Sequence, residues 1–137
     1  MSDDSAATAG MECARAFIDA FNAQDHERLA GTLNYPHIRL ANDRFVTIDS
    51  AADFAALSQQ GTSRLKAESW DHTVLKAIEV VHSGNGKVHM ALSIDRCHQD
   101  GTVYNRFETF WIATCQDTHW GIQFRSSYLI TPKPSGT

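Results

Sequence analysis

Four long runs of alternating apolar and polar residues occupy the second half of this chain, and short turn signals separate them. The runs are Trp70–Val81, Lys87–His98, Val103–Cys115 and Trp120–Thr131. A period of two residues is typical of strands that bury one face against a core. Asn85-Gly86 and Asp100-Gly101 stand between runs, and such dipeptides are strong hairpin signals. The pattern therefore predicts an antiparallel meander.

The first half of the chain has the periodicity of helices. One apolar stripe consists of Ala14, Phe17, Ile18 and Phe21. It predicts a helix from about Ser5 to Asn22. Asp25 predicts the cap of a short second helix, because its carboxylate accepts hydrogen bonds from free backbone N–H groups.

A third helix and two short strands are expected before the meander. Ser50 and Asp53 fit a capping box at the start of this helix, and we expect the helix to stop at Gly61. The segments Tyr35–Leu40 and Arg44–Ile48 alternate around a polar turn, which predicts two paired strands. Helices followed by a sheet define an α+β fold.

Composition limits the class of protein. The chain has 137 residues, 42% of them hydrophobic, which suits a single domain over residues 1–137, with residues 1–6 and 132–137 flexible. The net charge of −4, with scattered lysines and arginines, argues against a nucleic-acid partner. No apolar stretch reaches the ~20 residues that a membrane span needs, so we expect no membrane association.

The cysteines and the first residues predict a cellular location. Cys13, Cys97 and Cys115 are odd in number and widely spaced, which favours free thiols in a reducing compartment. Met1–Gly10 lacks the basic start and apolar run of a signal peptide. A cytoplasmic location is therefore expected.

Turn chemistry predicts which side chains share a face of the meander. If the Asp100-Gly101 turn pairs Gln99 with Thr102, the even-numbered residues from Met90 to His98 lie on the mostly apolar face, which we expect the helices to cover. Asp95 then lies opposite Arg106 on the outer face. Pairing Gln116 with His119 at the next turn continues both faces. It adds Ile122, Phe124, Ser126 and Tyr128 to the covered face and Gln123, Arg125 and Ser127 to the outer one.

The first hairpin allows two registers. A three-residue loop over Gly84–Gly86 places Trp70, His72, Val74, Ile78 and Val80 on the covered face. A two-residue Asn-Gly turn places Leu75 and Glu79 there instead, because a slip of one residue turns every side chain to the other face. We favour the three-residue loop, since it buries more apolar surface, and it sets His72 opposite His98.

Two segments resemble a known family. Ala16–Asn22, with the sequence Ala-Phe-Ile-Asp-Ala-Phe-Asn, precedes Gln24-Asp25 and a short leucine-bearing helix, and Trp120–Tyr128 closes the chain with Arg-Ser-Ser-Tyr. Together they resemble proteins related to nuclear transport factor 2, over roughly residues 8–130. The family includes steroid delta-isomerases, scytalone dehydratase, limonene epoxide hydrolase and SnoaL-type polyketide cyclases.

The resemblance implies a cone, in which a strongly bent mixed sheet of about six strands wraps around three helices and often dimerises through its outer face. Two departures from the steroid isomerases affect function. Their carboxylate base lies near the end of the first strand, where this chain has Arg39-Leu40-Ala41, and their first-helix tyrosine is matched here by Phe17 and Phe21. The resemblance therefore indicates the fold and leaves the chemistry open.

His72 and His98 are the candidate catalytic residues. Neutral imidazole titrates near working pH, and the expected pairing would place the two Cβ atoms about 5 Å apart. The alternative, which we favour, is that both histidines are solvated surface groups at a strand end. No HxH, HExxH or CxxC spacing supplies further ligands, so no metal site and no cofactor are expected.

Arg96 is the most unusual residue on the covered face, because a buried guanidinium needs an anionic or carbonyl partner. That partner is either a ligand carboxylate or an internal group such as Asp19. The other candidate ligand-binding residues are Asn105, Tyr35, Trp70, Thr109 and Ser126. Each of them has an ordinary structural alternative, Trp70 as a core residue for example.

These observations leave two functions open. One is a cofactor-independent lyase, isomerase or hydratase that acts on a small hydrophobic molecule with a polar or anionic group. The other is a non-catalytic ligand-binding or dimerisation module. A homodimer through the outer sheet face would bury Phe110 and Ile112, which otherwise remain exposed.

Overall fold

The computed structural model describes residues 3–129, with side chains from residue 5 onward. In chain order its elements are α1 (Asp3–Ala23), α2 (His26–Gly31), β1 (Leu33–Ala41), β2 (Arg44–Ile48), α3 (Ala51–Ala67), β3 (His72–Gly84), β4 (Lys87–Cys97), β5 (Val103–Gln116) and β6 (His119–Ser127). Of the ends predicted to be flexible, residues 1–2 and 132–137 lie outside the described range, and residues 3–6 belong to α1. Within that range, no helix is both long and apolar enough to cross a membrane.

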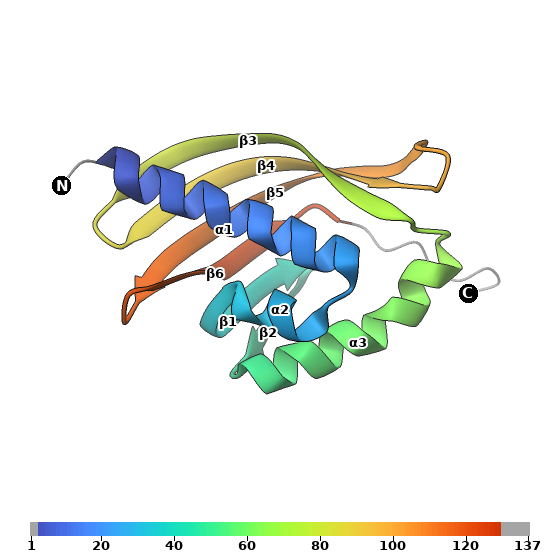
Figure 1. Cartoon of the computed structure of the whole chain (residues 1–137), viewed down its shortest axis with the longest axis horizontal. Helices are drawn as coiled ribbons and strands as arrows, with labels where there is room; N and C mark the ends of the chain where they lie inside the picture. The colour runs from blue at the N-terminus through green and yellow to red at the C-terminus, as the bar shows by residue number, and fades with distance from the viewer. Residues whose placement is uncertain (1–2, 130–137) are drawn as a thin grey trace.

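The six strands form one curved mixed sheet in the order β2-β1-β6-β5-β4-β3. Neighbouring strands are antiparallel except for β1 and β6, which are parallel. Figure 1 shows α1 lying along one face of the sheet. Helices α2 and α3 lie next to it, on the side of β1 and β2. The predicted α+β cone is thereby confirmed, with three helices on the concave face.

Two helix starts follow the predicted capping. The Asp25 carboxylate accepts a hydrogen bond from the Arg28 N–H, and the Ser50 hydroxyl accepts one from the Asp53 N–H. The predicted end of α3 at Gly61 is wrong, since the helix continues to Ala67. A glycine inside a helix costs only about 1 kcal/mol, which the burial of Leu65 on the next turn offsets.

The register between β4 and β5 is the predicted one from Arg96 onward, but the expected pairing at the Asp100-Gly101 turn is wrong. Cys97, and not His98, pairs with Val103, and a register shift between Cys97 and Arg96 then restores the expected pairs. Met90 pairs with Trp111, and Asp95 pairs with Arg106. Met90 and Trp111 are buried in the core, which confirms that this face is the covered one. On the outer face Arg106 donates to both Asp95 carboxylate oxygens, at 2.6 and 2.9 Å.

The expected faces of β6 are wrong beyond Ile122. Ala113 pairs with Ile122, as the turn predicts, but the next residue along β5, Ile112, pairs with Phe124. The extra residue in β6 is a bulge, and it turns all later side chains to the opposite face. Arg125 therefore points into the molecule. Phe124, Ser126 and Tyr128 point outward.

The first hairpin has the two-residue turn that we did not favour. Gly84 pairs directly with Lys87, and Gly86 adopts a φ of 73°, which glycine adopts without steric cost. Register shifts then occur between His82 and Val80 and between Ala77 and Leu75.

The two register shifts in β3 determine which of its side chains point toward the helices. The first restores Val80 and Ile78 to the covered face, opposite Met90 and Leu92. The second brings Leu75 inward and leaves Val74 outward and 41% exposed. The predicted covered position of Val74 is therefore wrong.

Candidate functional site

A cavity of about 380 Å³ opens between the concave face of the sheet and the three helices. Aromatic side chains from α1, α3 and β5 form much of its wall. They are Phe17, Phe21, Phe54, Phe107 and Trp111. Phe17 meets Trp111 edge to face with ring centroids 4.9 Å apart, so this wall is packed as a core would be.

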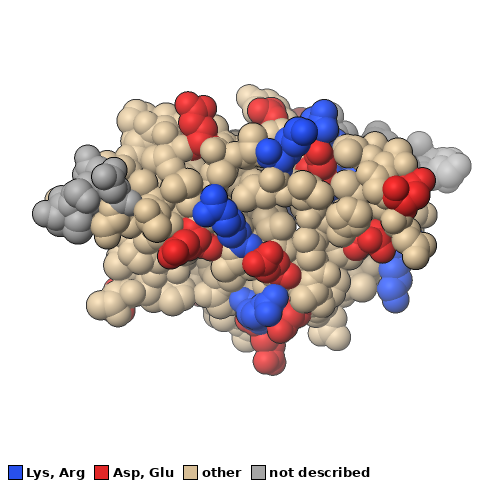
Figure 2. Space-filling view, turned by 45° about the horizontal axis from the view of Figure 1, so that its top comes forward, with Lys and Arg blue, Asp and Glu red and all other residues tan. Residues whose placement is uncertain are grey.

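Five arginines also line this cavity, which is the unusual feature of the site. They are Arg39, Arg44, Arg64, Arg96 and Arg125. No aspartate or glutamate of residues 5–129 belongs to the lining. The face of the molecule drawn in Figure 2 has a different character, since basic and acidic side chains are intermingled there among uncharged ones. The charged side chains that line the cavity are therefore all basic, with Arg39, Arg96 and Arg125 buried or half-buried and Arg44 and Arg64 exposed.

Arg125 comes from β6 and is the most deeply placed of these arginines, at 8% exposure. Its guanidinium carbon lies 5.0 Å from the centre of the Phe17 ring and 5.9 Å from that of Phe54. Burial lowers the pKa of Arg125 well below its usual value, and the nearby charge of Arg39 adds to that effect. Aromatic faces compensate a buried cation only partly, so the site favours an incoming anion.

His37 orients Arg125 without neutralising it. The His37 Nδ1 atom lies 3.0 Å from the carbonyl oxygen of Ile122, which only accepts, so this nitrogen carries the proton. The bare Nε2 accepts a hydrogen bond from Nε of Arg125 at 3.0 Å. Burial, reinforced by the charge of Arg125, lowers the pKa of His37 to about 3. The histidine is therefore a neutral acceptor.

Arg39 lies directly across from Arg125, on the neighbouring strand β1. Its Nε atom is buried and has no hydrogen-bond partner. Burial lowers the pKa of Arg39, and the charges of Arg96 and Arg64 lower it further. Two like charges in facing positions destabilise a sheet, so this pair has no structural benefit of its own.

Arg96 on β4 has a partial counterion. Its Nη1 lies 3.5 Å from Oε1 of Glu68, a long contact, and the same oxygen accepts a 2.6 Å hydrogen bond from the Tyr104 hydroxyl. The guanidinium also lies over the rings of Phe21 and Phe107. The Glu68 carboxylate is thus the one acidic partner, among residues 5–129, of the buried Arg125 and the half-buried Arg39 and Arg96.

Of the candidate site residues expected from sequence, Arg96 lines the cavity and the others do not. The Tyr35 hydroxyl donates to the Ala30 carbonyl, and the Trp70 indole donates to the Thr73 hydroxyl. Thr109 is buried and bonds to the Ser126 carbonyl. Asn105 pairs with Arg96 across the strands but stays outside the lining.

The predicted pairing of His72 with His98 is wrong. His72 pairs with Cys97 because of the second register shift in β3, and its ring contacts Asp71 at 2.8 Å. His98 lies beyond β4, stacked on Tyr104 and bonded to the Ser69 carbonyl. Neither ring lines the cavity, so a catalytic role for them stays a prediction without support from the geometry.

A different histidine lies behind the cavity wall. His26 Nδ1 lies 2.7 Å from the hydroxyl of Ser58, which lines the cavity from α3. Its other nitrogen lies 3.5 Å from the hydroxyl of Thr62, which donates to Gln24. Among residues 5–129, no group of His, Cys, Asp and Glu side chains is arranged to hold a metal ion.

Sequence reasoning missed Arg39 and Arg125. Arg39 stands between Ile38 and Leu40, and an arginine inside an apolar run is a signal of the same kind that marked Arg96. Arg125 had no comparable signal, because its facing depends on the bulge in β6.

Comparison with solved structures places the fold among known ones. A protein from Novosphingobium aromaticivorans described as a putative aromatic ring hydroxylase aligns with a TM-score of 0.71 at 11% identity, covering 96% of this chain and 94% of that one. A cystatin-like protein from Nostoc punctiforme aligns at 0.68 and 16%, covering 96% and 80%. A ketosteroid isomerase-like protein from Erwinia carotovora atroseptica aligns at 0.65 and 15%, covering 91% and 96%.

These likenesses define a class of protein by its fold, the NTF2-like cone, and at such low identity they define nothing more. No curated protein matches the chain. A family model for NTF2-like proteins (DUF6841) matches residues 12–126, and this chain belongs to that family.

Proposed function

We propose that this protein binds a small, largely apolar molecule that carries an acidic group. The observation that carries the proposal is the placement of Arg39, Arg96 and Arg125 on an aromatic cavity with a single partial counterion. Burying an unpaired charge costs several kcal/mol, and a bound anion would recover much of that cost. Arginine is suited to the task because its planar group binds carboxylate in a bidentate manner.

The shape of the cavity supports a defined binding orientation. Its volume of about 380 Å³ lies in the lower part of the range for small-molecule sites, roughly 300–1,000 Å³. The acidic group would contact Arg125 and Arg39, whose guanidinium groups lie at the β1–β6 side. The apolar body would pack on the aromatic wall that Phe21 and Phe107 extend.

The test uses a matched pair of compounds, naphthalene-2-carboxylate and naphthalene-2-carboxamide, which differ in charge and hardly in shape. Isothermal titration should show that the carboxylate binds at least about tenfold more tightly than the amide. The variant Arg125→Gln should remove most of this preference, because Arg125 contacts the acidic group. Arg15→Gln, an exposed change on α1, is the control and should retain it. Equal affinity for the two compounds would refute the proposal.

A catalytic version of this function has one supporting observation, the hydrogen bond between His26 and Ser58 at the cavity wall. In a lyase, isomerase or hydratase, His26 would be the general base that acts through the Ser58 hydroxyl or a water beside it. Recovery of a bound ligand unchanged after long incubation would favour simple binding. Turnover that Ser58→Ala abolishes would favour the enzyme.

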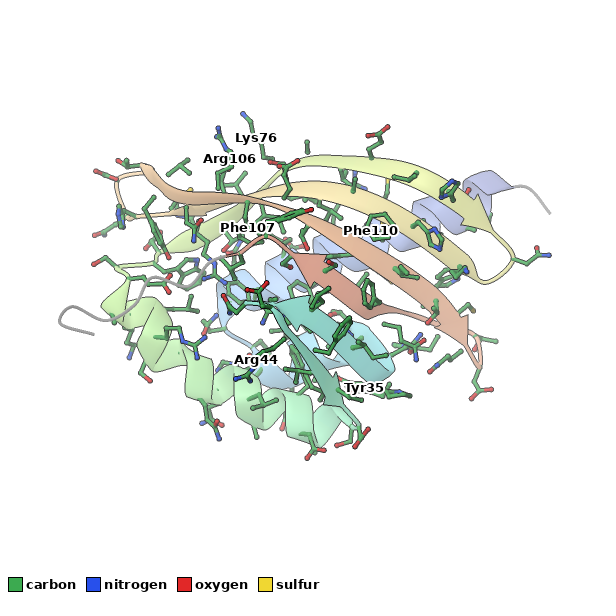
Figure 3. All side chains as sticks on the ribbon, turned by 180° about the vertical axis from the view of Figure 1, so that it is seen from behind. Tyr35, Arg44, Lys76, Arg106, Phe107 and Phe110 are labelled. Carbon is green, nitrogen blue, oxygen red and sulfur yellow. The ribbon has the colours of Figure 1, made fainter. Side chains whose placement is uncertain are left out.

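We also propose that two copies associate through the outer face of the sheet. Phe110, Ile112, Phe124 and Ile38 lie on this face, and Phe45 at its edge is 71% exposed. Figure 3 shows Phe110 on this side of the molecule. A second copy would cover these apolar groups, of which Phe45 is exposed and the other four are half-buried in a single chain.

A further inference from the structure

The mouth of the cone carries a second group of arginines beside the buried one. A hollow of about 370 Å³ is lined by Arg39, Ala41, Asn42, Arg44, Val46 and Arg64. Four of these residues, the three arginines and Val46, also line the main cavity. The two spaces therefore adjoin, and Arg39 stands between them.

The backbone brings Arg39, Arg44 and Arg64 to the same hollow, where the side chains of Arg44 and Arg64 are exposed. Asn42 and Asp43 form the two-residue turn between β1 and β2, with φ angles of 53° and 60°. The pairing of Ala41 with Arg44 closes this hairpin. Arg64 approaches from α3 because that helix continues past Gly61. Figure 3 shows Arg44 beside α3.

The charges in this hollow have no internal partner. Ion pairs within residues 5–129 join Asp71 to His72, Glu68 to Arg96 and Asp95 to Arg106, so Arg44 and Arg64 take part in none of them. The remaining lining, Ala41, Asn42 and Val46, is small and offers no aromatic surface. Such a hollow fits a compact oxyanion better than an apolar ring.

We infer that the molecule bound by this cone carries two acidic groups, one for the buried arginines and a second for the mouth cluster of Arg39, Arg44 and Arg64. The inference rests on the proposed function and adds the substrate class, a largely apolar molecule with two acidic groups, one on each side of Arg39. The second group is a carboxylate or a phosphate, since both present oxygens to an arginine in the same way.

The test uses α,ω-dicarboxylates from adipate to dodecanedioate, each compared at low ionic strength with its own monomethyl ester. At the best chain length the dicarboxylate should bind about tenfold more tightly than its half-ester, because the mouth arginines contact only the free acid. In the double variant Arg44→Gln/Arg64→Gln this ratio should fall to about one. Arg15→Gln should leave it unchanged. ω-Phosphonocarboxylates of the same lengths show which oxyanion the mouth prefers.

The outcomes separate this inference from the proposed function. If half-esters bind and no dicarboxylate of any length exceeds its half-ester, the second acidic group is refuted and the binding of an acidic molecule stands. A ratio that persists in the double variant also refutes it. If neither the half-esters nor the naphthalene carboxylate bind, the proposed function fails first.

Discussion

Arg125 donates its Nε–H to Nε2 of His37 across a distance of 3.0 Å, and both side chains are buried in the core. The imidazole holds its own proton on the opposite nitrogen, toward the Ile122 carbonyl. The guanidinium is therefore oriented by a neutral group, which does not pair with its charge. A carboxylate in the place of His37 would have fixed Arg125 equally well but would have neutralised it. This choice of partner is what leaves the charge available to a ligand.

The neutral state of His37 predicts acid sensitivity. Its pKa is about 3 in the folded protein against 6.5 in the unfolded chain. Below the unfolded pKa the unfolded state takes up a proton that the folded state refuses, so stability falls as pH drops from 6.5 toward 3. Near about pH 4.5 the free energy of unfolding should be lower by about 2–3 kcal/mol. Urea unfolding at neutral pH and at that acid pH measures this.

The control for that experiment is His37→Gln, which keeps an acceptor for Arg125 and a donor for the Ile122 carbonyl. Its stability should depend less on pH over the same range, by about the same 2–3 kcal/mol. An equal acid loss in the variant and the wild type would assign the effect to other groups.

Arg125→Met should separate stability from binding. Replacing a buried charge that lacks a counterion by an apolar side chain is commonly neutral or stabilising, and here the lost hydrogen bond to His37 offsets part of the gain. We expect the free energy of unfolding to change by no more than about 1 kcal/mol, while carboxylate affinity falls at least about tenfold. A loss of about 3–5 kcal/mol would mean that Arg125 is a structural residue.

Phe110→Glu should produce a monomer if two copies associate through the outer sheet face. A carboxylate there would have to be buried without a partner, which costs more than most interfaces supply. Sedimentation velocity reports the change directly. Gln116→Glu, an exposed substitution at the β5–β6 turn, adds the same charge and should leave the dimer intact. A dimer that survives Phe110→Glu would place the interface elsewhere.

Gly121 should tolerate no side chain. A Cβ atom built there would lie 2.6 Å from the Leu33 carbonyl carbon and 2.8 Å from the Asn34 nitrogen, where the parallel strands β1 and β6 meet. Gly121→Ala should cost about 2–4 kcal/mol, because backbone atoms cannot move aside cheaply. Gly61→Ala adds the same methyl to an open helix position and should stabilise by about 0.5–1 kcal/mol. Thermal or urea unfolding compares the two, and similar effects would contradict the close approach.

The fold and the position of one site residue, Arg96, could be predicted from the sequence. The pairing at the Asp100-Gly101 turn differs from the expected one by one residue, and the register shift between Cys97 and Arg96 cancels that difference. The alternation therefore placed Arg96 on the correct face. Arg125 and His72 were misplaced because register shifts in β6 and β3 precede them along their ladders. A bulge of this kind depends on how the whole sheet twists around the helices. The alternation of apolar and polar residues within one strand therefore does not predict where such a bulge lies.

The most direct measurement is a crystal structure of the protein with naphthalene-2-carboxylate bound. The account predicts the carboxylate within hydrogen-bond distance of the Arg125 guanidinium, about 2.7–2.9 Å, with the rings against Phe17 and Trp111. A ligand bound with its carboxylate in solvent, or at another site while the cone stays empty, would contradict it.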